Sequence, residues 1–298
     1  MIKRWASYLA LFVVAFSTVV AAPPAIAPAA AQQAQAHPDY RRAIELANGQ
    51  RLLSQRLIKQ LLLVALDIDK AQNIETMRRD QETFDAVLRG LRDGDPQLKL
   101  AGTADPAILE KLGRVEEIWP LLSAVIRESL GSGEVAPGQL TTAADLNLPL
   151  LRTLDETVAA FEEASRSTGL FSVLRVAIDL SVRQQLLSQK MSKEFFFIAR
   201  GHDVARSRRQ LSETIDQFDA GLSALIEGDP QRSLLPAPTP RIKAQLRSVQ
   251  RLWQIFQPLL ENGLRSDQIP TETVRQIAEM NLVLEQEMGA AVDMFEAL

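Results

Sequence analysis

One stretch of this chain occurs twice, and it decides what the chain can fold into. QRLLSQRLIK begins at Gln50 and QQLLSQKMSK begins at Gln184, so the offset between them is 184 − 50 = 134 residues. The same offset holds without a gap to the end of the chain. Further pairs related by it are Phe84 and Phe218, Trp119 and Trp253, Asn147 and Asn281, and Phe161 and Phe295. A fixed long period of this kind indicates a tandem duplication, so the fold consists of two copies of one unit.

Each copy has the apolar spacing of amphipathic helices. From Leu46 to Val64, apolar residues recur every three or four positions, which predicts a first helix. Gly94-Asp95-Pro96 predicts the end of the second helix, because glycine adopts the left-handed C-terminal conformation and proline cannot continue the helix. The expected helices are about 39–70, 74–92, 106–131 and 141–161 in the first copy, and about 170–200, 203–226, 240–264 and 271–297 in the second.

Four helices joined by short links form an up-and-down bundle. The predicted fold class is therefore all-α, with two tandem antiparallel four-helix bundles at residues 39–168 and 170–298. Composition agrees, because 46% hydrophobic residues with few aromatic ones are typical of an aliphatic helical core. The link from Glu162 to Leu170 contains Gly169 and no proline. We expect the last helix of copy one to run nearly straight into copy two with a bend at Gly169, which would stack the bundles end to end.

The first 31 residues predict a secretory signal peptide. Lys3 and Arg4 precede an apolar run, and 29–31 is an Ala-Ala-Ala cleavage site. Residues 32–38 are expected to be a disordered tether, because they lack apolar periodicity. The predicted location is the periplasm or the extracellular space. The alternative is an uncleaved leader that anchors the protein in the membrane, since the apolar run is long enough to span a bilayer.

Several classes of function are excluded by composition. The chain has no cysteine, and its two histidines, His37 and His202, give no metal-ligand spacing and no catalytic triad. No glycine-rich phosphate loop is present. A net charge of −4 gives no basic face for nucleic acid. We therefore expect no enzyme activity, no metal, no cofactor and no nucleic-acid partner.

The repeated motif carries polar residues on its apolar stripe. At 100° per residue, Gln50 and Ser54 point into the first bundle, and Gln184 and Ser188 point into the second. A buried amide or hydroxyl costs roughly 1–3 kcal/mol when it lacks a partner, so each copy has to supply one. The repeated amides Asn147 and Asn281 are the expected polar-layer support. The layer either fixes helix register or binds a ligand.

A second row of polar residues follows the edge of that stripe. Arg51, Gln55 and Lys59 lie at four-residue spacing, and copy two has Gln185, Gln189 and Lys193 at the equivalent positions. Such an edge lines a seam between helices or subunits when it is not simply solvated.

The loss of charge at the first of these positions predicts that copy one has the better anion site. A charge-assisted hydrogen bond is stronger than a neutral one. Arg183 is the residue that could supply the missing charge in copy two. The alternative to end-to-end stacking is that the two first helices pair within one chain and form a composite site from Arg51, Ser54, Gln55, Arg183, Ser188 and Gln189.

These two motif segments, AxxLANGQRLLSQRLIK and IDLSVRQQLLSQKMSK, resemble the first-helix motif of the PilJ/NarX-type sensory domain. That domain is the periplasmic module of type IV pilus chemotaxis transducers and of nitrate/nitrite sensor kinases. The resemblance implies a four-helix bundle that senses a small ligand, with an anion bound by a motif arginine across a dimer interface. Arg51 matches that arginine, and Gln185 departs from it. A homodimer is implied as well.

Two functions are compatible with the sequence. The first is an exported stand-alone sensory module that binds a small molecule or small anion and signals through a separate membrane receptor or kinase. The second is a structural or adaptor bundle without a small-molecule ligand. The expected ligand-binding residues are Gln50, Arg51, Ser54, Gln55, Arg183, Gln184, Ser188 and Gln189.

Overall fold

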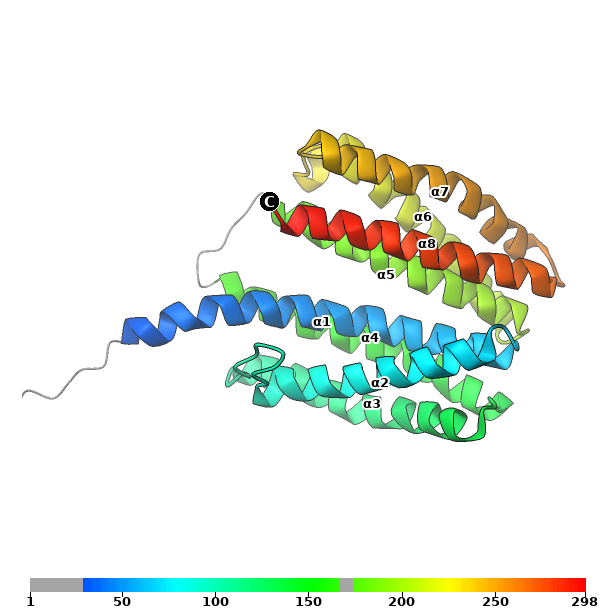
Figure 1. Ribbon diagram of the computed structural model, residues 1–298, viewed down its shortest axis with the longest axis horizontal. Helices are drawn as coiled ribbons and strands as arrows, with labels where there is room; N and C mark the ends of the chain where they lie inside the picture. Colours follow the sequence, from blue (N-terminus) through cyan, green and yellow to red (C-terminus); the bar gives the residue numbers. More distant parts are fainter. Residues whose placement is uncertain (1–28, 167–173) are drawn as a thin grey trace, which may run out of the picture. The chain divides into compact units, whose positions relative to one another are not determined.

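The computed structural model describes residues 29–166 and 174–298, and these form eight α-helices, one 3-10 turn and no strand. The first copy contains α1 (Ala29–Ala65), α2 (Lys70–Asp93), α3 (Pro106–Ser132) and α4 (Pro137–Arg166) (Figure 1). The second contains α5 (Leu174–Ala199), α6 (Val204–Glu227), α7 (Pro240–Arg265) and α8 (Thr271–Glu296), with the 3-10 turn η1 at Pro230–Arg232. The chain divides into two units, residues 1–35 and 36–298, and the second unit contains the packed helices of both copies.

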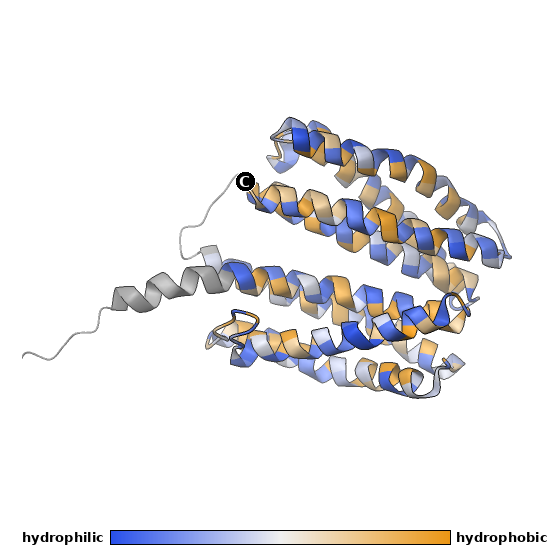
Figure 2. Ribbon diagram, in the orientation of Figure 1, coloured by the Kyte–Doolittle hydropathy of each residue, from blue (hydrophilic) through white to orange (hydrophobic). Residues whose placement is uncertain are grey.

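The helices of each copy pack as a bundle. α3 packs against α2 and α4, and the hydrogen bonds of Gln50 to the Phe84 carbonyl and of Gln55 to Asn147 join α1 to α2 and α4. In copy two, α6 packs against α5 and α7, and α8 packs against α5 and α7. The predicted all-α fold with two helical bundles is confirmed. Orange and blue residues alternate along the described helices in Figure 2, as the amphipathic pattern predicts.

The turn after the second helix of each copy is the same. Gly94 has φ 88° and Gly228 has φ 85°, a region that residues with a side chain rarely adopt. Each glycine is followed by a single antiparallel bridge, Asp95 to Leu100 and Asp229 to Leu234. The end predicted from Gly-Asp-Pro is therefore present in both copies.

Some helix boundaries differ from the prediction. α4 begins at Pro137 rather than near Thr141, because the fixed φ of proline suits the first position of a helix. α1 begins at Ala29, so residues 32–38 are helical rather than a disordered tether, and their alanines and glutamines favour helix. The leader before Ala29 and the bend at Gly169 lie outside the described residues.

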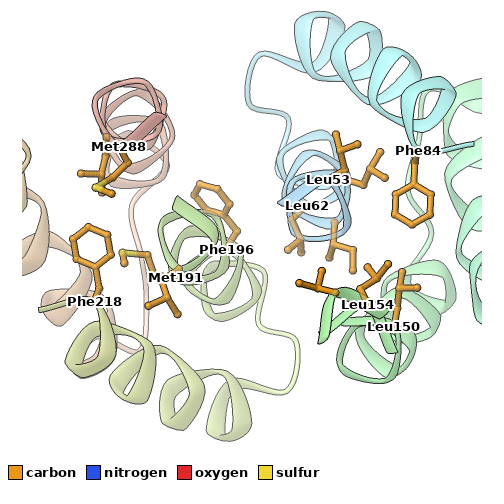
Figure 3. Close-up of a cluster of buried hydrophobic side chains, with 14 of the residues drawn as sticks. Leu53, Leu62, Phe84, Leu150, Leu154, Met191, Phe196, Phe218 and Met288 are labelled. Carbon is orange, nitrogen blue, oxygen red and sulfur yellow. The ribbon is translucent and has the colours of Figure 1, made fainter. Parts of the chain in front are cut away.

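The core of each bundle is built from equivalent side chains. Figure 3 shows Leu53, Phe84, Leu150 and Leu154 gathered between helices of the first copy, and Met191, Phe218 and Met288 gathered in the second. Phe84 stacks on Trp119 with a centroid distance of 3.8 Å, and Phe218 lies 4.5 Å from Trp253. Both indole nitrogens donate to a carboxylate on the preceding helix. Trp119 donates to Asp85 at 2.6 Å, and Trp253 donates to Asp219 at 2.9 Å.

Candidate functional site

The two copies meet along α1, in a region that we call the seam, where α1 faces α5 and α8. Lys193 Nζ donates to Gln55 Oε1 at 2.7 Å, and Lys59 Nζ donates to Asn281 Oδ1 at 2.7 Å. Because these contacts join the sides of helices, the expected end-to-end stacking is wrong, and the alternative of paired first helices describes the chain.

Buried apolar residues also lie beside the inward stripe of α1. Ile58 and Leu62 are fully buried, as are Leu57 and Leu61 on the stripe itself. A helix that is apolar over most of its circumference has to be covered on more than one side. α1 therefore contributes to its own bundle and to the seam.

A pocket of about 670 Å³ occupies the part of the seam that includes the N-terminal half of α5. α1, α5 and the C-terminal end of α8 line it. Most of its lining residues on α1 and α5 form pairs related by the 134-residue offset (184 − 50 = 134). These pairs are Arg41 and Arg175, Ile44 and Ile178, Glu45 and Asp179, Asn48 and Val182, Arg51 and Gln185, and Leu52 and Leu186. The pocket is thus formed by the same positions of both copies.

Arg51 is held at the edge of this pocket. Its Nε lies 2.6 Å from Asp155 Oδ1 of α4, and its Nη1 donates to Asn48 Oδ1 at 2.8 Å. The guanidinium is therefore oriented by two partners, and 16% of the side-chain surface is exposed to solvent. On the opposite helix, the equivalent lining residue is the neutral Gln185.

Charge is unevenly distributed around the pocket. Arg41, Arg51 and Arg175 supply positive charge, whereas four carboxylates supply negative charge, those of Glu45, Asp179, Asp293 and Glu296. Burial raises the pKa of Glu296, and the nearby Glu45 and Asp293 carboxylates raise it further. The remaining walls are apolar, with Val292, Phe295 and Leu298 contributed by the C-terminal segment. Such a pocket suits a small molecule with an apolar body and a charged group.

In copy one, the polar residues of the motif form a connected layer. Gln50 Nε2 donates to the Phe84 carbonyl at 3.0 Å. Ser54 Oγ donates to the Arg51 carbonyl at 2.7 Å. Gln55 Nε2 contacts both Ser54 Oγ at 3.1 Å and Asn147 Oδ1 at 3.0 Å. Asn147 thus accepts a hydrogen bond from Gln55, and the side-chain oxygen of Gln55 accepts one from Lys193.

The layer of copy two has fewer partners. Gln184 and Gln189 are fully buried, and neither atom of either side-chain amide has a hydrogen-bond partner among residues 29–166 and 174–298. Ser188 Oγ donates to the Gln185 carbonyl at 2.7 Å, and Asn281 Nδ2 donates to the Ser188 carbonyl at 2.8 Å.

Of the eight expected ligand-binding residues, Arg51 lines the pocket, whereas Gln50, Ser54, Gln55, Gln184, Ser188 and Gln189 do not. Arg183 also lies outside it. It is exposed, and its Nη2 donates to Gln217 Oε1 at 3.3 Å. It does not line the pocket, so it does not replace the charge that Gln185 lacks.

Lys59 and Lys193 are buried to 4% and 1% exposure, which the edge pattern left open. Desolvation lowers the pKa of Lys59 to about 8 and that of Lys193 to about 7, although nearby carboxylates oppose the shift. Sequence reasoning also missed Arg41 and Arg175 as pocket residues. The sequence did contain a signal for them, because Arg41 and Arg175 are related by the same 134-residue offset as the two copies of the motif.

Within residues 29–166 and 174–298, no helix has the length and apolar character needed to cross a bilayer. A comparison with curated proteins gave no match. A protein-family model, PilJ, described as "Type IV pili methyl-accepting chemotaxis transducer N-term", matches residues 40–147 and again residues 174–278. These two segments cover α1 from residue 40 onward, α2, α3, α5, α6 and α7, together with the first part of α4 and of α8, which is more than half of the chain. The chain therefore belongs to the PilJ family of chemotaxis transducer sensory modules and carries two tandem copies of its domain.

Proposed function

We propose that this protein senses a small ligand in the seam pocket and that Arg51 provides the principal charged contact. The observation that carries the proposal is the origin of the pocket walls. Equivalent positions of both copies of the repeated motif face one another there, and Arg51 and Gln185 are among them. A composite site of this kind needs only one chain, so a homodimer is not required to complete it.

The pocket favours a small ligand with at least one anionic group. Arg51 is a permanently charged donor whose partners hold it in place. Arg41 and Arg175 add positive charge to the lining, and Arg175 is balanced in part by Glu162 and Asp179. Gln185 offers only a neutral amide, so the anionic group should lie nearer α1 than α5. Gln50, Ser54 and Gln55 then act as support beneath Arg51, and Arg183 has no part in binding.

Signalling follows from the position of the pocket between the two copies. A ligand that contacts α1 and α5 together favours the arrangement in which these helices are close, and so shifts the population toward that arrangement. We propose that a membrane signalling partner reads this shift, as the chemotaxis transducer family implies. The proposed location is the periplasm after removal of the leader. Mass spectrometry of the exported protein should find an N-terminus near residue 32, and an intact Met1 in the membrane fraction would contradict cleavage.

Thermal-shift screening of small anions and carboxylates tests the binding proposal. A ligand that binds only the folded state at 100 times its Kd stabilises that state by about 2.7 kcal/mol. Arg51→Gln should lower the apparent affinity for the ligand more than tenfold and so reduce the thermal shift. Gln185→Arg should keep or increase that affinity.

Two controls make the test specific. Asp155→Asn removes the ion pair of Arg51 but keeps the guanidinium, and it should change affinity less than Arg51→Gln does. Arg78→Gln removes an exposed arginine of α2 and should have no effect. If no compound stabilises the protein, or if Arg51→Gln binds as well as the original chain, the structural or adaptor function is favoured instead.

A further inference from the structure

Two lysines lie along the seam beyond the pocket. Arg51 and Leu52 line the pocket, and Lys59 follows Arg51 by two helical turns, about 12 Å along the axis of α1. Both Lys59 and Lys193 are buried, and each donates to an amide oxygen, of Asn281 and of Gln55 respectively. Within the described part of the chain, neither lysine forms an ion pair with a carboxylate.

The carboxylates that act on these lysines already have basic partners. Glu285 is the strongest attractive charge on Lys59, and it pairs with Arg56 at 3.2 Å. Glu194 plays the same part for Lys193, and it pairs with Lys190 at 2.7 Å. The two ammonium groups are therefore buried without a carboxylate of their own.

Several buried hydrogen-bonding groups at this place lack a full set of partners among the described residues. An ammonium group has three donors, and one contact is made by each of these two. Gln189, the counterpart of Gln55, is fully buried, and the described part of the chain offers no partner to its Nε2 or Oε1. By the repeat, the counterpart of the bond from Lys193 to Gln55 would be a bond from Lys59 to Gln189. Lys59 donates to Asn281 instead. Asn281 in turn donates to the carbonyl of Ser188, the residue before Gln189. Unpaired buried donors and charges are costly, so such a cluster calls for an additional acceptor.

We propose that the seam binds a halide-sized inorganic anion, which accepts from Lys59, Lys193 or both and from the Nε2 group of Gln189. This site is separate from the pocket around Arg51 and does not depend on the organic or inorganic ligand proposed there. Its occupant replaces the missing carboxylate and fixes the two copies against each other.

The proposal implies a dependence on pH, because only a charged lysine attracts an anion. The pKa values of about 8 for Lys59 and about 7 for Lys193 mean that both groups are charged at pH 6 and largely neutral at pH 9. The other charges acting on Lys59 are Glu285, Arg56 and Asp80, and those acting on Lys193 are Glu194, Lys190 and Arg206. Anion binding should therefore be stronger at pH 6 than at pH 9.

Chloride is the probe, and sodium gluconate, whose anion is too large for a buried site, holds the ionic strength constant. The full mature protein is dialysed into gluconate, and Tm is followed by circular dichroism during chloride titration. At pH 6, chloride at ten times its Kd should raise Tm by about 4 °C. The rise should saturate and should be smaller at pH 9. Equal Tm values in chloride and gluconate at pH 6 would overturn the proposal.

Variants assign the effect to the seam. Lys59→Met and Lys193→Met should each reduce the chloride response, whereas Lys70→Met, which removes a lysine paired with the exposed Glu134, should keep it. Gln189→Glu supplies a carboxylate inside the chain. It should raise Tm in gluconate and abolish the response to chloride.

The last variant decides the question even if a methionine variant fails to fold, because it adds a partner for the lysines rather than removing one. A Gln189→Glu protein that is destabilised at pH 6 and still responds to chloride would contradict the proposed site.

Discussion

The two copies keep a basic residue at the same position of their first helix but place its buried carboxylate on different helices. In copy one, Arg56 pairs with Asp80 of α2 at 2.5 Å, and Gln60 donates to the same carboxylate at 2.7 Å. In copy two, Lys190 pairs with Glu194 of α5 at 2.7 Å and donates to Thr214 of α6 at 2.6 Å.

Glu194 occupies the position of Gln60, and Thr214 occupies that of Asp80, since both pairs follow the repeat offset. One carboxylate has been exchanged for another without changing the number of buried charges. A buried base left without a carboxylate is strongly destabilising, so the two substitutions had to compensate each other. The comparison shows that each copy keeps one buried carboxylate for its basic residue, although a different position of the repeat provides that carboxylate.

The largest expected effect comes from making only one of the two substitutions that distinguish copy two from copy one at positions 60 and 80. Asp80→Thr should destabilise the protein by about 3 kcal/mol, because it leaves Arg56 with only Glu285 and leaves Gln60 without an acceptor. Gln60→Glu alone should also destabilise, because it places a second carboxylate beside Asp80. The double variant recreates copy two and should recover stability to within about 1 kcal/mol. Urea denaturation of the four proteins gives the coupling energy, and additive effects would show that the positions are independent.

A second comparison concerns volume. A Cβ atom added to Gly263 would lie 2.3 Å from Cε2 of the Phe195 ring. At the equivalent positions, copy one has Leu61 in place of Phe195 and Ser129 in place of Gly263. Gly263→Ser should cost about 2–3 kcal/mol through overpacking, and adding Phe195→Leu should recover most of that loss. Ser129→Gly, the reciprocal change in copy one, should cost less than about 1.5 kcal/mol. Thermal unfolding measures all three, and a harmless Gly263→Ser would show that the ring can move aside.

The next effect depends on pH and separates the seam from the rest of each bundle. Desolvation lowers the pKa of Lys59 and Lys193 in the folded state to about 8 and about 7 from 10.5, so above these values the unfolded chain binds more protons than the folded one. The free energy of unfolding should therefore rise from about pH 7 to about pH 10 and level off beyond. The measurement is urea denaturation in gluconate. Lys193→Met should flatten the lower part of this rise, and an unchanged slope would argue against a depressed pKa.

The smallest effect tests where the copies are alike. Asp85→Asn and Asp219→Asn weaken the bond to the indole of Trp119 and of Trp253, and each should cost about 1 kcal/mol. Because the two environments are equivalent, the two costs should agree within about 0.5 kcal/mol. Denaturation curves of the two variants provide the comparison, and a larger difference would mean that the repeat has diverged in its core as well as at the seam.

Sequence reasoning recovered what local periodicity and turn chemistry determine. The helices, the stops at Gly94 and Gly228, and the burial of Gln50 and Ser54 all follow from spacing within one copy. The seam could not be derived in this way. Lysine is rarely buried, so the position of Lys59 on the edge of a stripe favoured solvent, and its burial depends on a helix more than 200 residues away, as in its contact with Asn281.

The pairing of the two first helices was predicted only as an alternative, and of the six residues expected in its composite site Arg51 alone lines the pocket. Ile58 and Leu62, which are buried, lie off the inward stripe. A single stripe per helix is the usual pattern, and a second one is visible only when both neighbours of the helix are known. That the amide of Gln189 lacks a partner among the described residues could not be predicted either, since its sequence context matches that of Gln55.

The construction of the pocket from equivalent positions of α1 and α5 has an evolutionary consequence. When two identical subunits enclose a site, one mutation alters both walls, and the site stays symmetric. In this chain the walls are encoded separately, so Arg51 and Gln185 could diverge without each other. Selection can then fit the pocket to a molecule whose two ends differ in charge.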